Sequence, residues 1–187
     1  SGNCGRRCKR SKKTDFLSSP TSTKRNGPSQ TVQPADFFDI SESLVTASRG
    51  RPKRVFLRRA VSTTYYALFH TLARSCADSL VGVTAANRSS EAWHQVYRSL
   101  DHGLAKKNCS SQRIREFPVE IRNFAELFCE MQAKRHAADY DPSAPHLKST
   151  VSLDIARVKD VVSAFQMQPI REKRAFSVFV LFKTRRD

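Results

Sequence analysis

The stretch that decides the fold lies at residues 51–80 and has the sequence RPKRVFLRRAVSTTYYALFHTLARSCADSL. Its apolar residues recur every three or four positions, as Leu57, Val61, Tyr65, Leu68, Leu72 and Cys76. This spacing places them along one face of an α-helix. Pro52 suits the first turn of such a helix, where a backbone N–H is not needed. The stretch therefore predicts a long helix that buries one face.

The segments on either side repeat the helical spacing. Apolar residues predict further helices over about 34–50, 89–103, 117–142 and 149–165, with a polar connection at 106–116. Pro118 stands at an initiating position, and Gly50 and His102-Gly103 stand at expected helix ends. Together these segments predict an all-α fold.

The segment 175–182, with the sequence AFSVFVLF, fits two structures. Its β-branched and aromatic residues suit a strand. However, the rest of the chain offers no partner strand, and the run Ile-Arg-Glu-Lys-Arg after Pro169 is typical of a helix start. We therefore predict a sixth helix here, and a bundle of five or six helices in total.

The chain is strongly basic, with 33 Lys and Arg against 17 Asp and Glu, a net charge of +16. The first 34 residues combine basic clusters with Ser, Thr, Pro and Gly, and they bury too little apolar surface to offset the entropy of ordering. We predict a flexible basic arm at 1–34 and a helical domain at 35–187. The domain is itself basic, so nucleic acid is the first expected partner and an anionic membrane the second. A third interpretation is that the charge serves solubility alone, without a partner.

Several classes of protein are not expected. No run approaches the roughly 18 apolar residues of a transmembrane helix, and the N-terminus lacks the apolar segment of a secretory signal. Five Cys, an odd number, lack paired metal-binding spacing; Cys4 and Cys8 have neither a second pair nor a nearby His. Cys76 and Cys129 fall in apolar helical patterns. We expect reduced thiols, a cytoplasmic location, and no metal, cofactor or membrane partner.

The helix at 117–142 carries the first candidate site. Its inward line of Ile121, Phe124, Phe128 and Met131 continues to Arg135. A guanidinium on an inward line must be paired or face a cleft, because an unpaired buried charge is very costly. Asp139 lies four residues on, within reach of Arg135. Two readings stay open here: a functional Arg135, or a structural Arg–Asp pair near a helix end.

The long helix carries the second signal. Arg59, Thr63, Tyr66, His70 and Arg74 cluster on the side opposite its apolar line. Such a face suits phosphate binding and base stacking, although a plain solvent-exposed face has the same pattern. His94, His102 and His146 are assigned no role, because nothing in their spacing distinguishes them.

Two motifs give the chain a resemblance to a known family. Residues 58–70 have the sequence RRAVSTTYYALFH, and residues 135–142 have the sequence RHAADYDP. With Trp93-His94 and Phe117-Pro118 between them, the stretch over about 36–166 resembles the HEPN family of prokaryotic helical proteins.

The resemblance implies an up-and-down antiparallel bundle that usually forms a homodimer. Active HEPN members use the motif R-x4–6-H to cleave RNA without a metal, with the 2′-hydroxyl as nucleophile. Several members pair with a nucleotidyltransferase as toxin and antitoxin, and others only bind nucleotide or RNA. Arg135 matches the motif Arg, but Tyr140, Asp141 and Pro142 stand where its His is expected.

The sequence predicts three alternative functions, in order from the most to the least expected. The first is a non-catalytic or weakly catalytic module that binds RNA or nucleotide phosphate through Arg59, Tyr66, His70, Arg135 and Asp139. The second is a metal-independent ribonuclease toxin, with Arg135, Tyr140 and His70 as candidate catalytic residues. The third is an interaction bundle whose polar face binds a nucleotidyltransferase-type protein.

Overall fold

The computed structural model describes residues 1–2, 33–47, 52–84, 86 and 88–183. The predicted basic arm therefore lies almost entirely outside the described residues. The chain divides into residues 1–31 and residues 32–187, and the helices of the described residues belong to the second unit.

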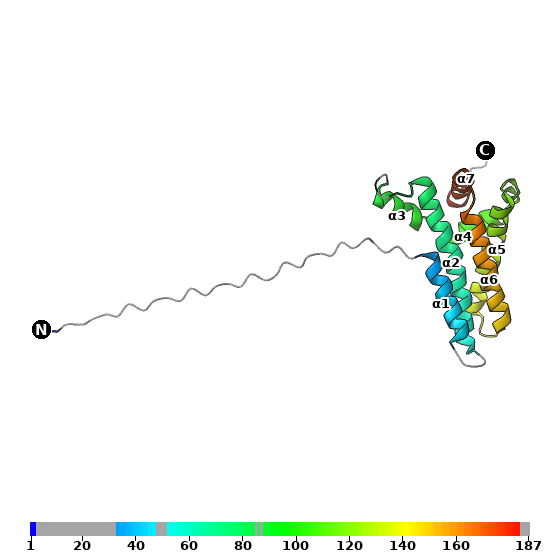
Figure 1. The fold of residues 1–187 in the computed structure, drawn as a ribbon, viewed down its shortest axis with the longest axis horizontal. Helices are drawn as coiled ribbons and strands as arrows, with labels where there is room; N and C mark the ends of the chain where they lie inside the picture. The colour runs from blue at the N-terminus through cyan, green and yellow to red at the C-terminus, as the bar shows by residue number, and fades with distance from the viewer. Residues whose placement is uncertain (3–32, 48–51, 85, 87, 184–187) are drawn as a thin grey trace. The chain divides into compact units, whose positions relative to one another are not determined.

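The described residues contain helices and no strand, which confirms the all-α prediction (Figure 1). The α-helices are α1 (Pro34–Thr46), α2 (Arg54–Leu80), α3 (Ser90–Arg98), α4 (His102–Cys109), α5 (Val119–Tyr140), α6 (Lys148–Gln166) and α7 (Ile170–Leu181). A 3-10 helix, η1 (Gln112–Glu116), lies between α4 and α5. None of these helices is long and apolar enough to span a membrane.

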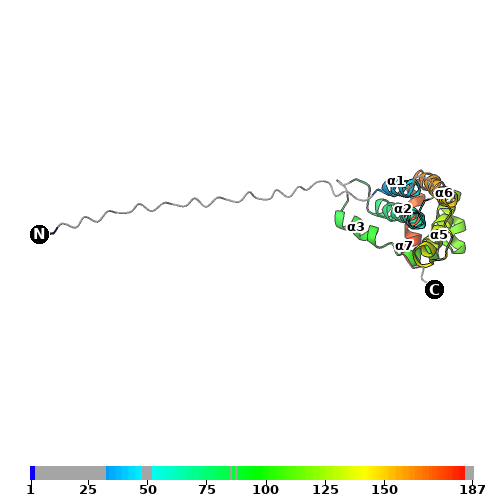
Figure 2. The ribbon, with the colours of Figure 1, turned by 90° about the horizontal axis from the view of Figure 1, so that it is seen from below.

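The long helix α2 is the centre of the fold. It packs against α1, α3, α5, α6 and α7, while α5 packs on α6 and α6 on α1 (Figure 2). The predicted apolar line of α2 is buried, and small residues such as Ala60, Ala67, Ala73 and Ala77 are fully buried as well. Because these small side chains let neighbouring helices approach closely, α2 is covered on several sides rather than on one.

Two helix boundaries differ from the predictions at the start of the domain. The first helix ends at Thr46, before the predicted stop at Gly50, which lies outside the described residues. The second begins at Arg54 after the N-cap Lys53, so Pro52 precedes the helix instead of lying in its first turn.

The prediction of a helix end at His102-Gly103 and a connection at 106–116 is wrong. A new helix, α4, begins at His102, and η1 follows it. Asp101 explains the restart, because its carboxylate accepts a hydrogen bond from the Leu104 N–H over 2.7 Å and so caps α4. Gly103 lies in the first turn, where a Cβ would stand 3.3 Å from that carboxylate. The described residues therefore hold seven α-helices, more than the five or six predicted.

The prediction of a C-terminal helix is confirmed by α7, with Pro169 as its N-cap. Phe176 on α7 is fully buried and packs edge-to-face against Phe165 of α6, with ring centres 5.9 Å apart. Phe165 in turn stacks on Phe124 of α5 at 4.3 Å. Of the aromatic residues that suggested a strand, Phe176 therefore lies in the core, Phe179 is half-buried and Phe182, just after the helix, is exposed.

Candidate functional site

The candidate site lies where α2, α5 and the start of α4 meet, and Arg135 of α5 is its cation. Its Nε lies 2.7 Å from Oδ2 of Asp139, one helical turn further on. The other carboxylate oxygen of Asp139 accepts a hydrogen bond from the Ser62 hydroxyl of α2 over 2.6 Å. The predicted Arg–Asp pair is therefore present, and a residue of α2 holds it in place.

Arg135 also contacts Tyr66 of α2. Its Nη2 donates a hydrogen bond to the Tyr66 hydroxyl over 3.3 Å, and its guanidinium carbon lies 5.6 Å from the ring centre. The side chain of Arg135 stays 23% exposed. Its buried Nε makes no hydrogen bond within the described residues, because the N–H does not point at Asp139. Residues of α2 and α5 thus orient the guanidinium, but they do not accept hydrogen bonds from all of its N–H groups.

Tyr65 and Tyr66 divide between the core and the site, as their adjacent positions on α2 require. Tyr65 is fully buried, and burial raises the pKa of its phenol well above the ordinary value, so the phenol stays protonated. Tyr66 is half-buried and lies beside Arg135. The two rings contact each other with centres 5.7 Å apart.

His70 lies one turn after Tyr66 on α2, with ring centres 6.1 Å apart. It stacks on Phe37 of α1 at 4.8 Å, and its Nδ1 forms a 2.6 Å hydrogen bond with the Tyr97 hydroxyl of α3. The predicted solvent-exposed face of α2 is therefore partly covered by α1 and α3 at this point. Burial, followed by the charge of His102, lowers the pKa of His70.

His102 belongs to the same cluster, although the sequence analysis assigned it no role. It stacks on Phe69 at 3.9 Å, and its Nδ1 forms a 2.6 Å hydrogen bond with the Tyr65 hydroxyl. Its ring centre is 6.5 Å from that of Tyr66. Burial and then the positive charge of Arg135 lower its pKa. Its contacts are with residues of α2 and α5 that are distant in the sequence, so helical spacing gave no signal for it.

The other residues that were predicted for the site contact residues outside this cluster. Tyr140 is 67% exposed and packs on His136 at 4.8 Å. Arg59 is exposed, and its backbone carbonyl accepts a hydrogen bond from Thr63. Arg74 binds Gln33 through a hydrogen bond and lies 3.6 Å from Asp78 in an ion pair. The structure therefore brings together Tyr66, His70, Arg135 and Asp139, and adds Ser62 and His102 to them.

The second half of the 135–142 motif has a structural contact of its own. Arg58 donates a 2.8 Å hydrogen bond to the backbone carbonyl of Asp141, and Arg54 donates to the carbonyls of Pro142 and Ala144. The first arginines of α2 thus hold the chain just after α5. This contact gives the basic residues at the start of the long helix a structural role.

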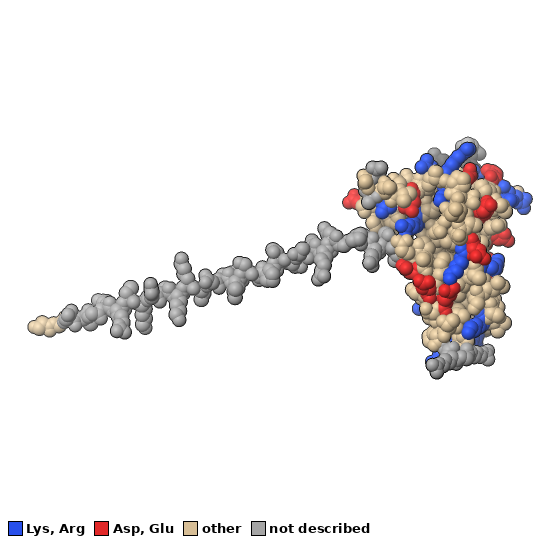
Figure 3. All heavy atoms as spheres, viewed as in Figure 1, with Lys and Arg blue, Asp and Glu red and all other residues tan. Residues whose placement is uncertain are grey.

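The charges on the bundle are mixed rather than gathered on the face that Figure 3 draws, where Lys and Arg alternate with Asp and Glu. Within the described part of the chain, no group of three or more His, Cys, Asp or Glu side chains is arranged to hold a metal ion. Cys4 and Cys8, the pair considered for zinc, lie outside that part. The side chains gathered at the site supply one guanidinium, one carboxylate, a serine hydroxyl, two imidazoles and several aromatic rings.

Searches against protein-family models, curated proteins and solved structures gave no match for this chain. The resemblance to the HEPN family therefore stays a prediction that is based on residues 58–70 and 135–142.

Proposed function

We propose that this chain is a HEPN-like module that binds RNA or a nucleotide phosphate at the cluster of Tyr66, His70, His102 and Arg135, with little or no catalysis. The proposal is based on one observation: the partly exposed Arg135 guanidinium is held against the Tyr66 ring, next to two imidazoles. A guanidinium binds phosphate oxygens, and aromatic or imidazole rings stack on bases.

Asp139 fits this role as a positioning residue. A carboxylate beside the guanidinium fixes the plane of the fork, and Ser62 fixes the carboxylate. The Nη1 nitrogen of Arg135 makes no hydrogen bond or ion pair with the described residues, which leaves it for a phosphate oxygen. Because Asp139 neutralises part of the charge, we expect modest affinity from this site, with further affinity from the positive charge of the rest of the chain.

We extend the proposal to the topology and the assembly. The mutual packing of α1, α2, α5 and α6 supports an up-and-down HEPN-like bundle. We further propose that two copies pair, as the family resemblance implies. The partly exposed aromatic residues Phe37, Tyr66, Phe69 and Tyr97 lie around His70 on one side of the bundle and support such pairing.

The test is a binding titration of labelled single-stranded RNA in EDTA over a range of salt concentrations. We expect the affinity to fall steeply as salt rises, and Arg135→Ala to weaken it by about tenfold, the loss of about one charge-assisted contact. Arg122→Ala is the matched control, since Arg122 is an exposed arginine of the same helix that lies outside the cluster. Salt-insensitive binding, or equal losses in the two variants, would contradict the proposal.

A metal-independent ribonuclease is the second candidate, and the presence of two imidazoles near Arg135 favours it. The missing motif His is then replaced by His70 or His102, whose lowered pKa values keep them neutral and able to act as bases near pH 7. Incubation of the protein with total RNA in EDTA tests this function. Cleavage that is lost in Arg135→Ala, while the circular dichroism spectrum is unchanged, would make the protein an enzyme; absence of cleavage leaves the binding module.

A further inference from the structure

A pair of cysteines lies where α4 packs on α5. Cys109 is the last residue of α4 and is buried, while Cys129 of α5 is half-buried. The Cys129 sulfur lies 3.3 Å from the hydroxyl of Ser110, the residue that follows Cys109, and 3.7 Å from the backbone carbonyl of Lys106, so the end of α4 lies directly against Cys129. Both are free thiols in this structure.

The surroundings of Cys129 favour its thiolate form. The Ser110 hydroxyl lies 3.3 Å from its sulfur, and Lys106 of α4 contributes a positive charge nearby. The neighbouring Cys109 thiol, followed by the Ser110 hydroxyl and the charge of Lys106, lowers the pKa of Cys129 against the opposing effect of burial, and the proximity of Cys129 raises the pKa of Cys109. Cys129 is thus the more acidic of the two thiols, and the thiolate is the form of a cysteine that attacks an oxidant.

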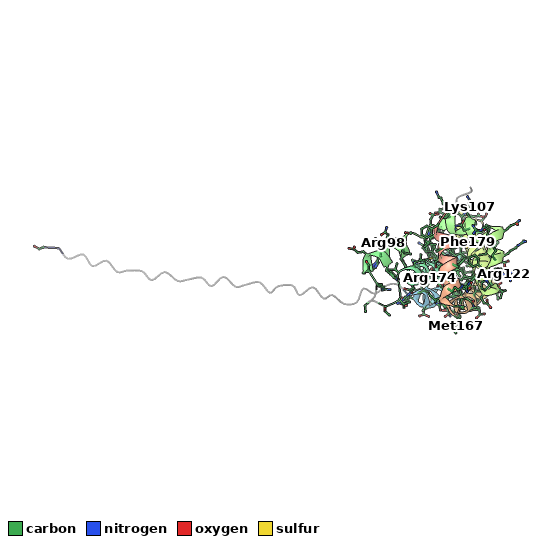
Figure 4. All side chains as sticks on the ribbon, turned by 90° about the horizontal axis from the view of Figure 1, so that it is seen from above. Arg98, Lys107, Arg122, Met167, Arg174 and Phe179 are labelled. Atoms are coloured by element: carbon green, nitrogen blue, oxygen red, sulfur yellow. The ribbon has the colours of Figure 1, made fainter. Side chains whose placement is uncertain are left out.

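The half-buried Cys129 is accessible from solvent. Both cysteines line an open pocket of about 490 Å³, together with Ser110, Arg122 and Glu126. Figure 4 views this end of the molecule, with Lys107 of α4 and Arg122 of α5 labelled. A small oxidant therefore has a route to the Cys129 sulfur. Cys76, by contrast, is fully buried in α2, and burial raises its pKa to about 12.

We propose that Cys109 and Cys129 form a redox-active thiol pair that hydrogen peroxide converts to a disulfide between α4 and α5. The Cys129 thiolate attacks one peroxide oxygen; the O–O bond breaks, hydroxide leaves, and Cys129 becomes a sulfenic acid. The Cys109 sulfur then attacks the sulfenic sulfur, its proton and the hydroxyl group leave as water, and the S–S bond forms. The protein loses two electrons, and peroxide gains them.

The measurement is peptide mapping of the full-length wild-type chain before and after treatment with hydrogen peroxide. Trypsin releases Cys109 in the peptide 108–113 and Cys129 in the peptide 123–134. We expect these two peptides to become linked, with a mass lower by two hydrogen atoms than the sum of the reduced peptides, and to separate again with dithiothreitol. Absence of this link, or a link from Cys129 to Cys4, Cys8 or Cys76 in its place, would overturn the proposal.

Two variants test the order of the steps. Cys109→Ser removes the resolving thiol, so we expect a stable sulfenic acid at Cys129 that dimedone traps. Cys76→Ser is the control, and it should form the 108–113 to 123–134 link as the wild type does. No dimedone adduct at Cys129 in a folded Cys109→Ser variant would show that the thiol pair does not react as proposed. The wild-type mapping does not depend on how either variant folds.

Discussion

The guanidinium carbon of Arg135 lies 5.6 Å from the ring centre of Tyr66, and its Nη2 donates a hydrogen bond to the Tyr66 hydroxyl. This contact joins the two helices that carry the family-like motifs, α2 and α5. It also places an aromatic face next to a cation. Proteins use this combination to bind nucleic acids, because the ring stacks on a base and the cation contacts a phosphate. The contribution of Tyr66 can therefore be separated into its ring and its hydroxyl.

Two substitutions of Tyr66 separate the contribution of its ring from that of its hydroxyl. Tyr66→Phe keeps the ring and removes the hydroxyl that accepts from Arg135, so we expect RNA affinity to change by less than about threefold, a fraction of one hydrogen bond. Tyr66→Ala removes the stacking surface and should lower affinity by about tenfold. Fluorescence anisotropy with labelled RNA measures both effects.

Tyr140→Ala is the control for this series, because Tyr140 is an exposed tyrosine near the end of the same motif. Its removal should leave affinity close to that of the wild type. If Tyr140→Ala weakens binding as much as Tyr66→Ala, RNA binds nearer the end of α5, and the cluster around Arg135 is a structural one.

The histidines of the cluster predict a pH dependence. Burial lowers the pKa of both His70 and His102 below the ordinary value of 6.5. A bound phosphate favours the protonated imidazoles, so RNA affinity should rise as pH falls below 6.5. Without ligand the sign is opposite for stability: the unfolded chain takes up protons at a higher pH than the folded one, so stability is lost as pH falls through this range.

NMR titration of the histidine ring protons measures these midpoints, with His70→Gln used to assign the His70 signal. Midpoints below 6.5 in the free protein, which rise when inorganic phosphate is added, are the expected result. A free-protein midpoint at or above 6.5 for both residues would contradict the burial that the cluster requires.

The contact between α5 and α6 predicts a second pH effect, at lower pH. Glu130 accepts two 2.9 Å hydrogen bonds from Arg157 and lies 2.8 Å from Lys134. The hydrogen bonds from Arg157 and then Lys134 lower the pKa of Glu130 from 4.5 to about 2. The folded state therefore gains stability from this group above pH 4.5 and loses it between pH 4.5 and pH 2. Because Arg157 is 46% exposed, solvent screening limits the gain to about 1 kcal/mol.

Urea unfolding of Glu130→Gln and of the wild type measures the contribution of this carboxylate to the free energy of unfolding. The difference in unfolding free energy should be about 1 kcal/mol at pH 6 and should shrink toward zero as pH approaches 2. Glu116→Gln, a change at an exposed position of η1, should show no such pH-dependent difference. A Glu130→Gln difference that stays constant with pH would mean that packing, rather than the carboxylate charge, is responsible.

Part of the site could be predicted from the sequence because its contacts are local. Arg135 and Asp139 are four residues apart on one helix, and Tyr66 and His70 are likewise four apart on α2, so helical spacing alone places each pair together. That the two pairs meet depends on the packing of α2 on α5, which spacing does not reveal.

The missed elements depended on distant or weak signals. His102 pairs with Tyr65, far away in sequence, and α4 has eight residues of which only Ala105 and Cys109 are buried. Two buried positions are too few to produce a helical period. The polar run at 106–116 therefore suggested a connection. The helix at α7 was predictable, because Pro169 marks its start and no second strand was available to pair with it.

The aromatic core between α5, α6 and α7 predicts a large loss of stability on truncation. Phe124 is fully buried, stacks on Phe165 at 4.3 Å and meets Phe176 edge-to-face at 6.4 Å. Phe124→Ala removes both contacts and leaves a cavity that three helices line, so we expect a loss of about 3–5 kcal/mol in unfolding free energy. Val119→Ala is the control on the same helix, because Val119 is 48% exposed and should cost less than about 0.5 kcal/mol. Urea denaturation followed by circular dichroism distinguishes the two. If both variants lost the same small amount, Phe124 would not be in the core, and its ring contacts with Phe165 of α6 and Phe176 of α7 would be wrong.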